Sequence, residues 1–523
     1  MKLLKIAPVC MALCLSLCLA GCGSNTRTPS PSNIPVHTFG GTEEATQPEE
    51  TTLPAETTAP TEDPLTQVED ITAVVTAEDI SILEQYPNLK KADLTGSTCY
   101  AAIAEYMAAH PQVEVIFTLS LGGEELPGDT EELTLAEGEY DYALLLENLK
   151  YLPNLTGLSL PQTALTAQQL QELTAAYPDL PISYTVVEFG IEYDSAATEL
   201  DLSFLKATQA EQAAGLLAKL PALTNVELMN GTYSSLTLSD VKLLADAAPN
   251  AAFHYEFYLF GKRVSTADTS LEYTKYSIGN DGIEQIRQAL DIMRQCTYVK
   301  LDNCGVDNEV MAQLREDYRD RGVKIAWRIW FGKYTVMTDT EKIRAVYNVF
   351  DTTCHDLMYC EDVKYIDMGH NDSLTDLSWV AYMPNLEIMI ISGCAVTDLT
   401  GFENCKKLEF LELASCGYLE DLTPLAGCES LKYLNISHTK VTNLMPLDGL
   451  PLERFVCVKP KVPTAERETF AAIHEDCWIK YTGYEYGEAW RYDDNGKTYS
   501  EIYKKIREIF GYDNMVVEPV EKK

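Results

Sequence analysis

An internal repeat near the C-terminal end is the feature that most constrains the fold of this chain. Its four copies begin at Val363, Leu386, Leu408 and Leu431, so they follow one another at nearly constant spacing. Each copy has apolar residues at alternate positions, then a turn, then a second apolar cluster, as in "LEFLELASCGYLEDLTPL". One copy alone cannot bury its leucines, so we expect the copies to stack with their strands side by side.

These copies, which cover residues 363–451, resemble a known repeat family. The pattern L-x-x-L-x-L followed by Asn, Cys or Thr is similar to that of leucine-rich repeats, and "LEDLTPLAGC" resembles the internalin-type repeats of bacterial surface proteins. The resemblance implies an α/β fold, namely a curved leucine-rich repeat solenoid with strands on one side and helices on the outer side. It also implies binding, without saying which partner.

Residues 68–362 carry a longer repeat, about three times the length of the short one. Strand-like pieces such as "TGLSLPQ" and "TNVELMN" recur in it, with their last inward apolar residues at Leu94, Leu160, Leu228, Leu301 and Met368. Within each unit the pattern predicts a strand, an amphipathic helix, a second strand, a turn, a third strand and another helix. We therefore expect an α/β array of mixed repeat lengths.

Three capping-box spacings predict where helices begin in this region. The pairs are Thr166 with Gln169, Thr208 with Glu211, and Thr338 with Glu341. A threonine at the N-cap satisfies a free backbone N–H of the first helical turn, and the third helical residue returns the hydrogen bond. We therefore expect a helix to begin after each of these threonines.

A strand followed by a turn glycine recurs at the period of the long repeat. The turn glycines are Gly122, Gly190, Gly261 and Gly332, which are almost evenly spaced along the chain. This recurrence indicates a requirement of the fold rather than a single ligand site. A fifth copy at Cys477–Trp490 matches the pattern less well, and we expect it to cover the last coil. We assign residues 452–523 as a C-terminal capping segment.

The fourth of these strands, in "AWRIWFGKYTV", is unusually rich in aromatic residues. Strand alternation places Ile325, Trp327, Ile329 and Phe331 on one face and Trp330 on the other. We expect the first four side chains to be buried and Trp330, on the opposite face, to be the ring that can contact something else.

The start of the chain, up to Gln67, predicts export and a membrane anchor. Lys2 and Lys5 precede an apolar stretch that ends in "LAGC" at Cys22. This pattern resembles the lipobox of bacterial lipoproteins, which implies that residues 1–21 are a signal peptide and that Cys22 is lipidated; an ordinary cleaved signal peptide is the alternative. Residues 22–67 are rich in Thr, Pro and Glu and predict a disordered tether. The predicted location is extracytoplasmic, lipid-anchored to the bacterial cell membrane.

The net charge of the chain limits the classes of partner that it can bind. Seventy-nine acidic residues against 40 basic ones give a formal net charge of -39. Because nucleic-acid affinity depends mainly on Lys and Arg that neutralise phosphates, nucleic acid is excluded as a partner. An anionic membrane surface would also repel the body, so we expect membrane contact through the lipid anchor only.

Eleven cysteines follow Cys22, and four of them recur at repeat positions. These four are Cys394, Cys405, Cys416 and Cys428. Unpaired cysteine is among the most buried residue types, so we expect these four to be buried inside the coils. Disulfides among the other cysteines remain open.

Two short segments suggest a metal site, and neither fits one. The segment "TTCHDLMYC" contains Cys354, His355, Asp356 and Cys360 but lacks the C-x-x-C spacing of a zinc site, and adjacent residues rarely face each other as nucleophile and base. "RYDDNGKTYSE", near Asp493, places a lysine where a calcium loop needs an oxygen ligand. The sequence has no nucleotide-binding loop, serine elbow or zinc-protease motif, so we predict no catalytic residue, no cofactor and no metal.

Side chains between the inward leucines of the short repeats predict a partner-binding surface. The first column is Tyr365, Ile388, Phe410, Tyr433 and Arg454, and the second is Asp367, Ile390, Glu412, Asn435 and Val456. Aromatic residues and arginine are enriched in protein interfaces, so we predict that this surface contacts a protein or peptide. In the alternative, the C-terminal "EIYKKIREIFGY" folds over these columns and buries them.

The features together predict a lipid-anchored leucine-rich repeat protein of the cell surface that binds a protein or peptide and is not an enzyme. Two alternatives remain open. One is a cell-envelope enzyme that acts on carbohydrate, and the other is a structural or assembly lipoprotein that associates with itself or with an envelope complex.

Overall fold

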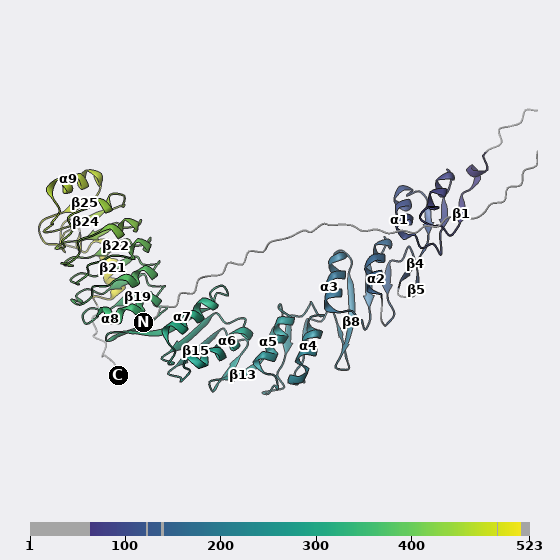
Figure 1. Ribbon diagram of the computed structural model, residues 1–523, viewed down its shortest axis with the longest axis horizontal. Helices are drawn as coiled ribbons and strands as arrows, with labels where there is room; N and C mark the ends of the chain where they lie inside the picture. Colours follow the sequence, from purple (N-terminus) through teal and green to yellow (C-terminus); the bar gives the residue numbers. More distant parts are fainter. Residues whose placement is uncertain (1–62, 122–123, 138–140, 489, 514–523) are drawn as a thin grey trace, which may run out of the picture. The chain divides into compact units, whose positions relative to one another are not determined.

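The computed structural model describes most of the chain after the predicted tether (Figure 1). The described residues are 63–121, 124–137, 141–488 and 490–513. The chain divides into two units, Met1–Gln67 and Val68–Lys523. Cys22, the signal peptide, nearly all of the tether and Gly122 lie outside the described residues. Within those residues, no helix is both long enough and apolar enough to cross a membrane.

The short repeats form one parallel sheet of seven strands. Its strands, in chain order, are β19 (Lys342–Arg344), β20 (Tyr365–Asp367), β21 (Ile388–Ile390), β22 (Phe410–Glu412), β23 (Tyr433–Asn435), β24 (Arg454–Val456) and β25 (Trp478–Lys480). Each strand pairs in parallel with the next, residue triplet to residue triplet. The four predicted copies thus form four stacked coils, with one strand added before them and two after.

The central residue of each strand triplet fills the core of its coil. Ile366, Met389, Leu411, Leu434 and Phe455 are all fully buried, and each is the register partner of the next. Between strands, each coil has a short 3-10 helix: η7 (Ser378–Tyr382), η8 (Phe402–Asn404), η9 (Thr423–Gly427) and η10 (Met445–Leu447). So short a repeat leaves little chain outside the strand and turns, so a tight 3-10 turn closes each coil rather than an α-helix.

Each long repeat consists of three parallel strands followed by an antiparallel hairpin. The parallel sets are β1 (Asp70–Thr72), β2 (Lys91–Asp93) and β3 (Glu114–Ile116); β6 (Glu132–Thr134), β7 (Gly157–Leu160) and β8 (Ile182–Glu188); β10 (Glu199–Asp201), β11 (Asn225–Glu227) and β12 (Ala252–His254); and β15 (Ser270–Thr274), β16 (Tyr298–Asp302) and β17 (Lys324–Phe331). The hairpins use β4 (Thr118–Leu121) with β5 (Glu124–Pro127), β8 with β9 (Ile191–Asp194), β13 (Glu256–Leu259) with β14 (Lys262–Ser265), and β17 with β18 (Tyr334–Met337).

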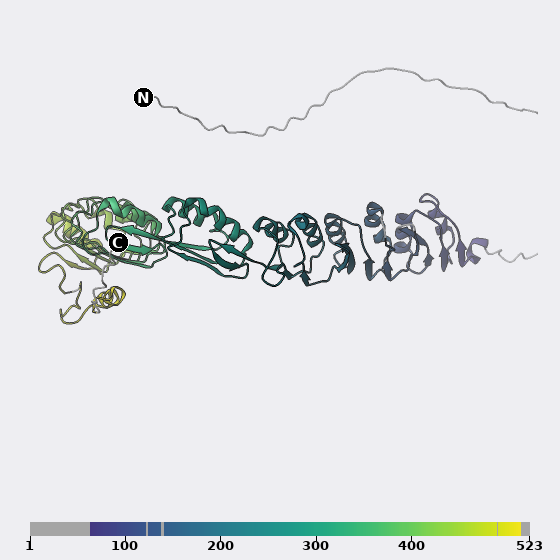
Figure 2. The same ribbon diagram turned by 90° about the horizontal axis from the view of Figure 1, so that it is seen from below.

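Helices connect the parallel strands within each long repeat. They are α1 (Tyr100–Ala109), α2 (Tyr142–Asn148), α3 (Ala167–Ala176), α4 (Ala210–Leu217), α5 (Leu238–Ala247), α6 (Ile283–Ile292) and α7 (Asn308–Asp317). Figure 2 shows α6 and α7 on one side of their own strands. After the long repeats come α8 (Asp351–Cys354), α9 (Thr464–Ile473) and α10 (Glu501–Phe510).

The predicted order of elements in the long repeat lacks one strand. The chain does not pass from each hairpin directly into a helix, because β6, β10, β15 and β19 come between them. Three of these strands are only three residues long and carry a single inward apolar residue, such as Leu133 or Ile343. One such residue cannot produce a recognisable alternation, so the pattern missed these strands.

One of the three predicted capping boxes is confirmed; at Thr208 a helix follows but the threonine is not its N-cap, and at Thr338 no helix begins. Thr166 is the N-cap of α3 and forms a complete capping box. Thr208 instead lies inside a 3-10 turn, η4 (Ala207–Gln209), ahead of α4. Thr338 starts no helix, because its side chain accepts a hydrogen bond from the Trp327 N–H at 3.1 Å and the chain then enters β19.

The prediction for the aromatic strand β17 is confirmed. Ile325, Trp327, Ile329 and Phe331 are buried, whereas Trp330 is 44% exposed. The turn glycines are confirmed too, since Gly190, Gly261 and Gly332 have φ angles of 75°, 79° and 62° in the hairpin turns. A side chain at such an angle would be strained, which explains why glycine recurs at this position.

Candidate binding surface on the seven-stranded sheet

The two predicted columns lie side by side on one face of the seven-stranded sheet. The residues of the first column are register partners of one another across β20 to β24, and so are the residues of the second. Because strand residues alternate between faces, both columns lie opposite the core residues of the coils. The sequence therefore identified a continuous surface. We call it the strand face.

The strand face is covered by the C-terminal end of the chain. Ile388, Phe410, Glu412 and Asn435 are buried, although the coils themselves leave this face open. An apolar cluster joins these columns to Trp490 and to residues of α10. In Figure 2 the helix α10, in yellow, lies apart from the helices on the opposite side of the green sheet.

An exposed strand face is therefore wrong for this structure, and the alternative with "EIYKKIREIFGY" folded over the columns is the one observed. The nine residues proposed for partner contact, Tyr365, Asp367, Ile388, Ile390, Phe410, Glu412, Tyr433, Asn435 and Arg454, instead contact or lie near this covering segment. Their binding to an external partner remains a prediction.

Apolar packing holds the covering segment at its centre. The Trp490 ring stacks on the Phe410 ring, with 4.7 Å between the ring centroids. Tyr503, Ile506 and Phe510 of α10 are buried in the same cluster. Full burial of a large apolar side chain contributes roughly 1.5–3 kcal/mol, so these four residues are the main source of attachment.

Glu412 is the polar centre of the contact. Its side chain is 1% exposed, and it accepts hydrogen bonds from the Trp490 Nε1–H and, at 3.4 Å, from Arg491 Nη2. On the sheet side, Ser392 Oγ donates to the same carboxylate at 2.8 Å. The buried negative charge is thus satisfied jointly by the sheet and by the covering segment.

Asp367 makes a second polar contact, nearer to β19. The Tyr512 hydroxyl donates to Asp367 Oδ2 at 2.9 Å, and Arg344 Nε lies 3.3 Å from the same oxygen. Burial, together with the negative charge of Asp367, raises the pKa of Tyr512 well above its ordinary value. The phenol therefore stays protonated and can donate throughout the physiological pH range.

Ion pairs at the rim of the contact are more exposed. Arg454 Nη1 lies 3.0 Å from Asp494 Oδ1, and Lys505 Nζ lies 3.6 Å from Glu387 Oε2. Pairs of this kind typically contribute about 0–1 kcal/mol. They orient the covering segment more than they hold it.

A cavity of about 320 Å³ remains between the strand face and the covering segment. Both buried acids line it, and so do three arginines, Arg344, Arg491 and Arg507. The two surfaces therefore do not fill the space between them as a closely packed core does.

Reasoning from the sequence offered the segment "EIYKKIREIFGY" only as the alternative cover of the strand face and did not include Trp490 in it. No residue of that segment was singled out as a contact, although Tyr503, Ile506, Phe510 and Tyr512 lie with Trp490 in or against the apolar cluster. The spacing of Tyr503, Ile506 and Phe510 is that of one helix face and was available as a signal. What the spacing does not contain is the identity of the surface on which that face packs.

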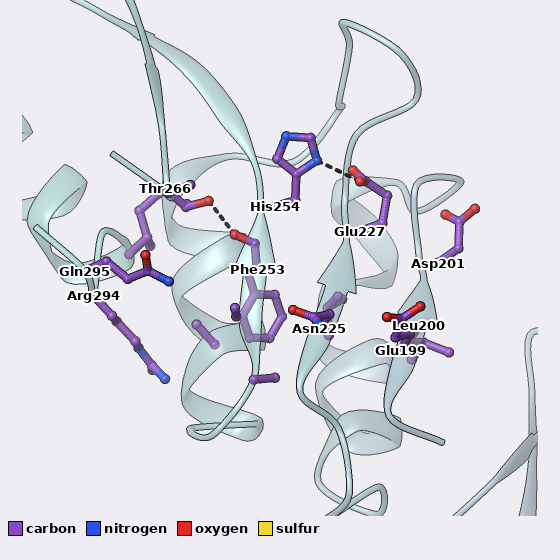
Figure 3. Close-up of a pocket in the computed structure, with 16 residues that line it drawn as sticks. Glu199, Leu200, Asp201, Asn225, Glu227, Phe253, His254, Thr266, Arg294 and Gln295 are labelled. Carbon is purple, nitrogen blue, oxygen red and sulfur yellow. Dashed lines mark hydrogen bonds and ion pairs between the residues drawn. The ribbon is translucent and has the colours of Figure 1, made fainter. Parts of the chain in front are cut away.

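A second cavity, of about 650 Å³, lies near β12 (Figure 3). His254 Nδ1 lies 2.7 Å from Glu227 Oε2, and Thr266 Oγ1 donates to the backbone oxygen of Phe253. The next parallel strand, β15, belongs to another sheet, so the ladder ends at β12 and leaves space beside it. No Ser, Cys, Lys or Tyr is among the described residues that line this cavity, and its position at a repeat junction explains it structurally.

The four repeat cysteines are buried, which confirms the prediction. All eleven described cysteines are free, and burial raises the pKa of Cys416 to about 12. Cys354 and Cys360 are buried while His355 between them is exposed, so these three side chains do not converge. Among the described residues there is no group of three His, Cys, Asp or Glu side chains that could hold a metal ion.

The carboxylate of Asp493 is used within its own turn. It accepts hydrogen bonds from the backbone N–H groups of Asn495 and Lys497, each at 3.1 Å, and from Thr498 Oγ1 at 2.6 Å. The Thr498 hydroxyl is the main cause of a lowered Asp493 pKa. This turn links Trp490 to α10 and thereby returns the chain across the strand face.

Comparisons with known proteins find likeness only among solved structures. No family model matches the chain, and no curated protein matches it. The internalin inlF of Listeria monocytogenes is 15% identical to this chain. The match covers 69% of this chain and 84% of the internalin chain, with a TM-score of 0.26. Internalin C2 of the same organism is 13% identical over 53% of this chain and 84% of its own, with a TM-score of 0.23. A leucine-rich repeat protein of Leptospira interrogans is 16% identical over 80% of this chain and 97% of its own, with a TM-score of 0.26. At such low similarity, these likenesses carry no argument about function.

Proposed function

We propose that this chain is a lipid-anchored leucine-rich repeat protein of the bacterial cell surface that binds a protein or peptide non-covalently through its strand face. The observation that supports the proposal is the strand face itself, which holds a polypeptide segment by aromatic stacking and by hydrogen bonds to Glu412 and Asp367. Aromatic residues and arginine anchor many protein interfaces. A face with this chemistry is suited to bind a polypeptide.

The proposed anchor is the lipidated Cys22 followed by the tether of residues 22–67. In cells, Cys22→Ser is expected to move the protein from the membrane fraction to the soluble extracytoplasmic fraction, because two acyl chains hold a protein stably to a bilayer. Cys18→Ser makes the same substitution upstream of the "LAGC" pattern and is the matched control. Retention of the Cys22→Ser protein in salt-washed membranes would contradict the anchor.

The proposed binding activity is tested with the full chain on intact cells. Proximity labelling is expected to identify a protein or peptide that the purified full-length protein then binds saturably in calorimetry. Turnover of an envelope carbohydrate without such a ligand would favour the enzyme alternative. Labelling of only this chain or of envelope assembly components would favour the structural alternative.

A further inference from the structure

We infer that the strand face of β20 to β24 is a groove for an amphipathic helix of a partner protein, and that the chain's own residues 490–513 occupy it as a displaceable internal ligand. These residues are the covering segment, and we now call them the C-terminal segment. The inference rests on the proposed function for the existence of a partner. The displacement of the C-terminal segment can be measured without that partner.

The C-terminal segment can leave without disturbing the sheet. Among the described residues, β25 is the last strand of the sheet, and it precedes the segment in the chain. The segment therefore adds no strand to the sheet. The contacts between the segment and the sheet come from side chains or involve a single backbone oxygen, as where Lys342 Nζ donates to the Ile509 oxygen at 2.7 Å. Since no described strand or helix follows the segment, its release breaks no described coil.

The two buried carboxylates indicate a binding face rather than a permanent core. Glu412 and Asp367 are 1% and 5% exposed, and enclosing a carboxylate costs free energy that its ion pair does not always offset. An apolar residue at either position would serve a permanent core better. On an open strand face, both carboxylates would be hydrated and available to donors of a ligand, the role that Trp490, Arg491 and Tyr512 now fill.

The fit between the C-terminal segment and the sheet is incomplete. Besides the cavity of about 320 Å³, Arg491 Nε is buried without a hydrogen-bond partner among the described residues. Buried polar atoms of a core are nearly always paired. A ligand that fills this cavity and pairs the acids more fully would therefore bind the face better than the segment does.

The occupied groove defines the chemistry of the partner. The segment presents Tyr503, Ile506 and Phe510 on one face of α10. The donors to the two acids, Trp490, Arg491 and Tyr512, flank this helix. The partner that fits is an amphipathic helix with an aromatic and aliphatic face and a basic edge, since the body carries a large excess of negative charge. Tethering gives the C-terminal segment an effective concentration on the order of millimolar, so the partner must bind more tightly than the isolated segment.

A labelled peptide tests the displacement directly. The probe is a fluorescent synthetic peptide of residues 490–513, and the receptors are three full-length proteins: wild type, Ile506→Asp and Lys504→Gln. Ile506 is fully buried against the sheet, whereas Lys504 on the same helix is exposed, and both substitutions lower the charge by one. Ile506→Asp is expected to release the tethered segment and to bind the probe at least tenfold more tightly than the other two proteins, as measured by fluorescence anisotropy.

Folding of the Ile506→Asp protein is checked by circular dichroism, and release of its segment by tryptic cleavage at Lys504 or Lys505. Equal probe affinity for the three proteins, or no binding to a folded Ile506→Asp protein, would overturn the inference. A wild-type dimer that Ile506→Asp abolishes in light scattering would also overturn it, because the occupant would then be a second copy of the chain. If no partner is found on cells but Ile506→Asp binds the probe tightly, only the proposed function is contradicted. If a partner is found but the probe does not bind, the partner binds on another surface of the protein.

Discussion

Two tryptophans on the same strand show how the strand position decides the role of a side chain. Trp327 is 2% exposed, donates from Nε1 to Asn308 Oδ1 at 2.9 Å, and lies beneath the Arg315 guanidinium. Trp330 is 44% exposed on the other face of β17 and donates to Asn303 Oδ1 at 3.3 Å. Trp327 is therefore the ring that packs in the core.

This difference predicts unequal costs of truncation. Trp327→Ala is expected to lower the free energy of unfolding by about 3–5 kcal/mol, because it opens a cavity in the core. Trp330→Ala is expected to change it by about 0.5 kcal/mol or less, as is usual at surface positions. Urea denaturation of the two variants measures both values, and equal losses would contradict the assignment of the two faces.

An ion pair beside Trp330 predicts a pH dependence. Arg328 donates to both carboxylate oxygens of Asp302 at 2.6 and 2.9 Å, and this hydrogen bonding lowers the pKa of Asp302 below its ordinary value. Since the folded pKa lies below that of the unfolded chain, about 3.9, the pair stabilises the fold above about pH 4 and loses this effect as pH falls through the folded pKa. The melting temperature of wild type is expected to exceed that of Asp302→Asn at pH 7, and the gap should shrink near pH 2.5. A gap that is constant between the two pH values would refute this role.

At the scale of elements, three hairpins are closed by the same hydrogen bond from a backbone N–H to a hydroxyl. The donors and acceptors are Tyr184 to Ser195, Tyr255 to Thr266, and Trp327 to Thr338, each at 3.1 Å. In each hairpin, the residue that carries the hydroxyl also donates its own backbone N–H to the backbone oxygen of its partner, at 2.9 Å. A side chain thus extends the antiparallel pairing by one rung, where the chain turns towards the next coil.

Removal of one of these hydroxyls is expected to destabilise its hairpin. Thr338→Val keeps the shape but leaves the buried Trp327 N–H without an acceptor, which costs about 1–3 kcal/mol. Thr338→Ser retains the hydroxyl and is expected to cost less than half as much. Chemical denaturation of both variants provides the measurement, and Thr266→Val should repeat the effect one unit earlier. If valine and serine cost the same, the hydroxyl contributes little.

For the whole molecule, the apolar core is not one continuous body. Separate clusters of buried apolar side chains span residues 83–117 and 119–184, whereas one cluster extends from Val186 to Phe470. The hydrogen-bonded ladders are likewise interrupted, since β3, β8 and β12 do not pair with the first strand of the next unit. The early units therefore receive less support from their neighbours than the seven-stranded sheet does.

Unfolding of the described body is therefore expected in more than one step. In a repeat array, stability is the sum of each unit and its interfaces, so a unit with a separate core opens first. Hydrogen exchange measured by mass spectrometry should show α1 and β7 losing protection at least tenfold faster than β21 and β22. A single exchange rate for all four elements would indicate a fully cooperative body.

The sequence by itself determined the repeats, the inward residues of each coil and the buried face of β17. These features depend on spacing within a few residues, so alternation along a strand is sufficient to predict which side chains are buried. It also located the strand face, because the same alternation separates the two columns from the core residues.

Only the tertiary structure decided that the strand face is covered. Tyr512 and Asp367 meet although they lie 145 residues apart, and neither α10 nor the sheet contains a local signal that selects the other. Both present apolar faces, and burial of apolar surface is favourable but not directional. The choice of partner depends on where the chain can return after β25 and on how its donors meet Glu412 and Asp367, which no local pattern records.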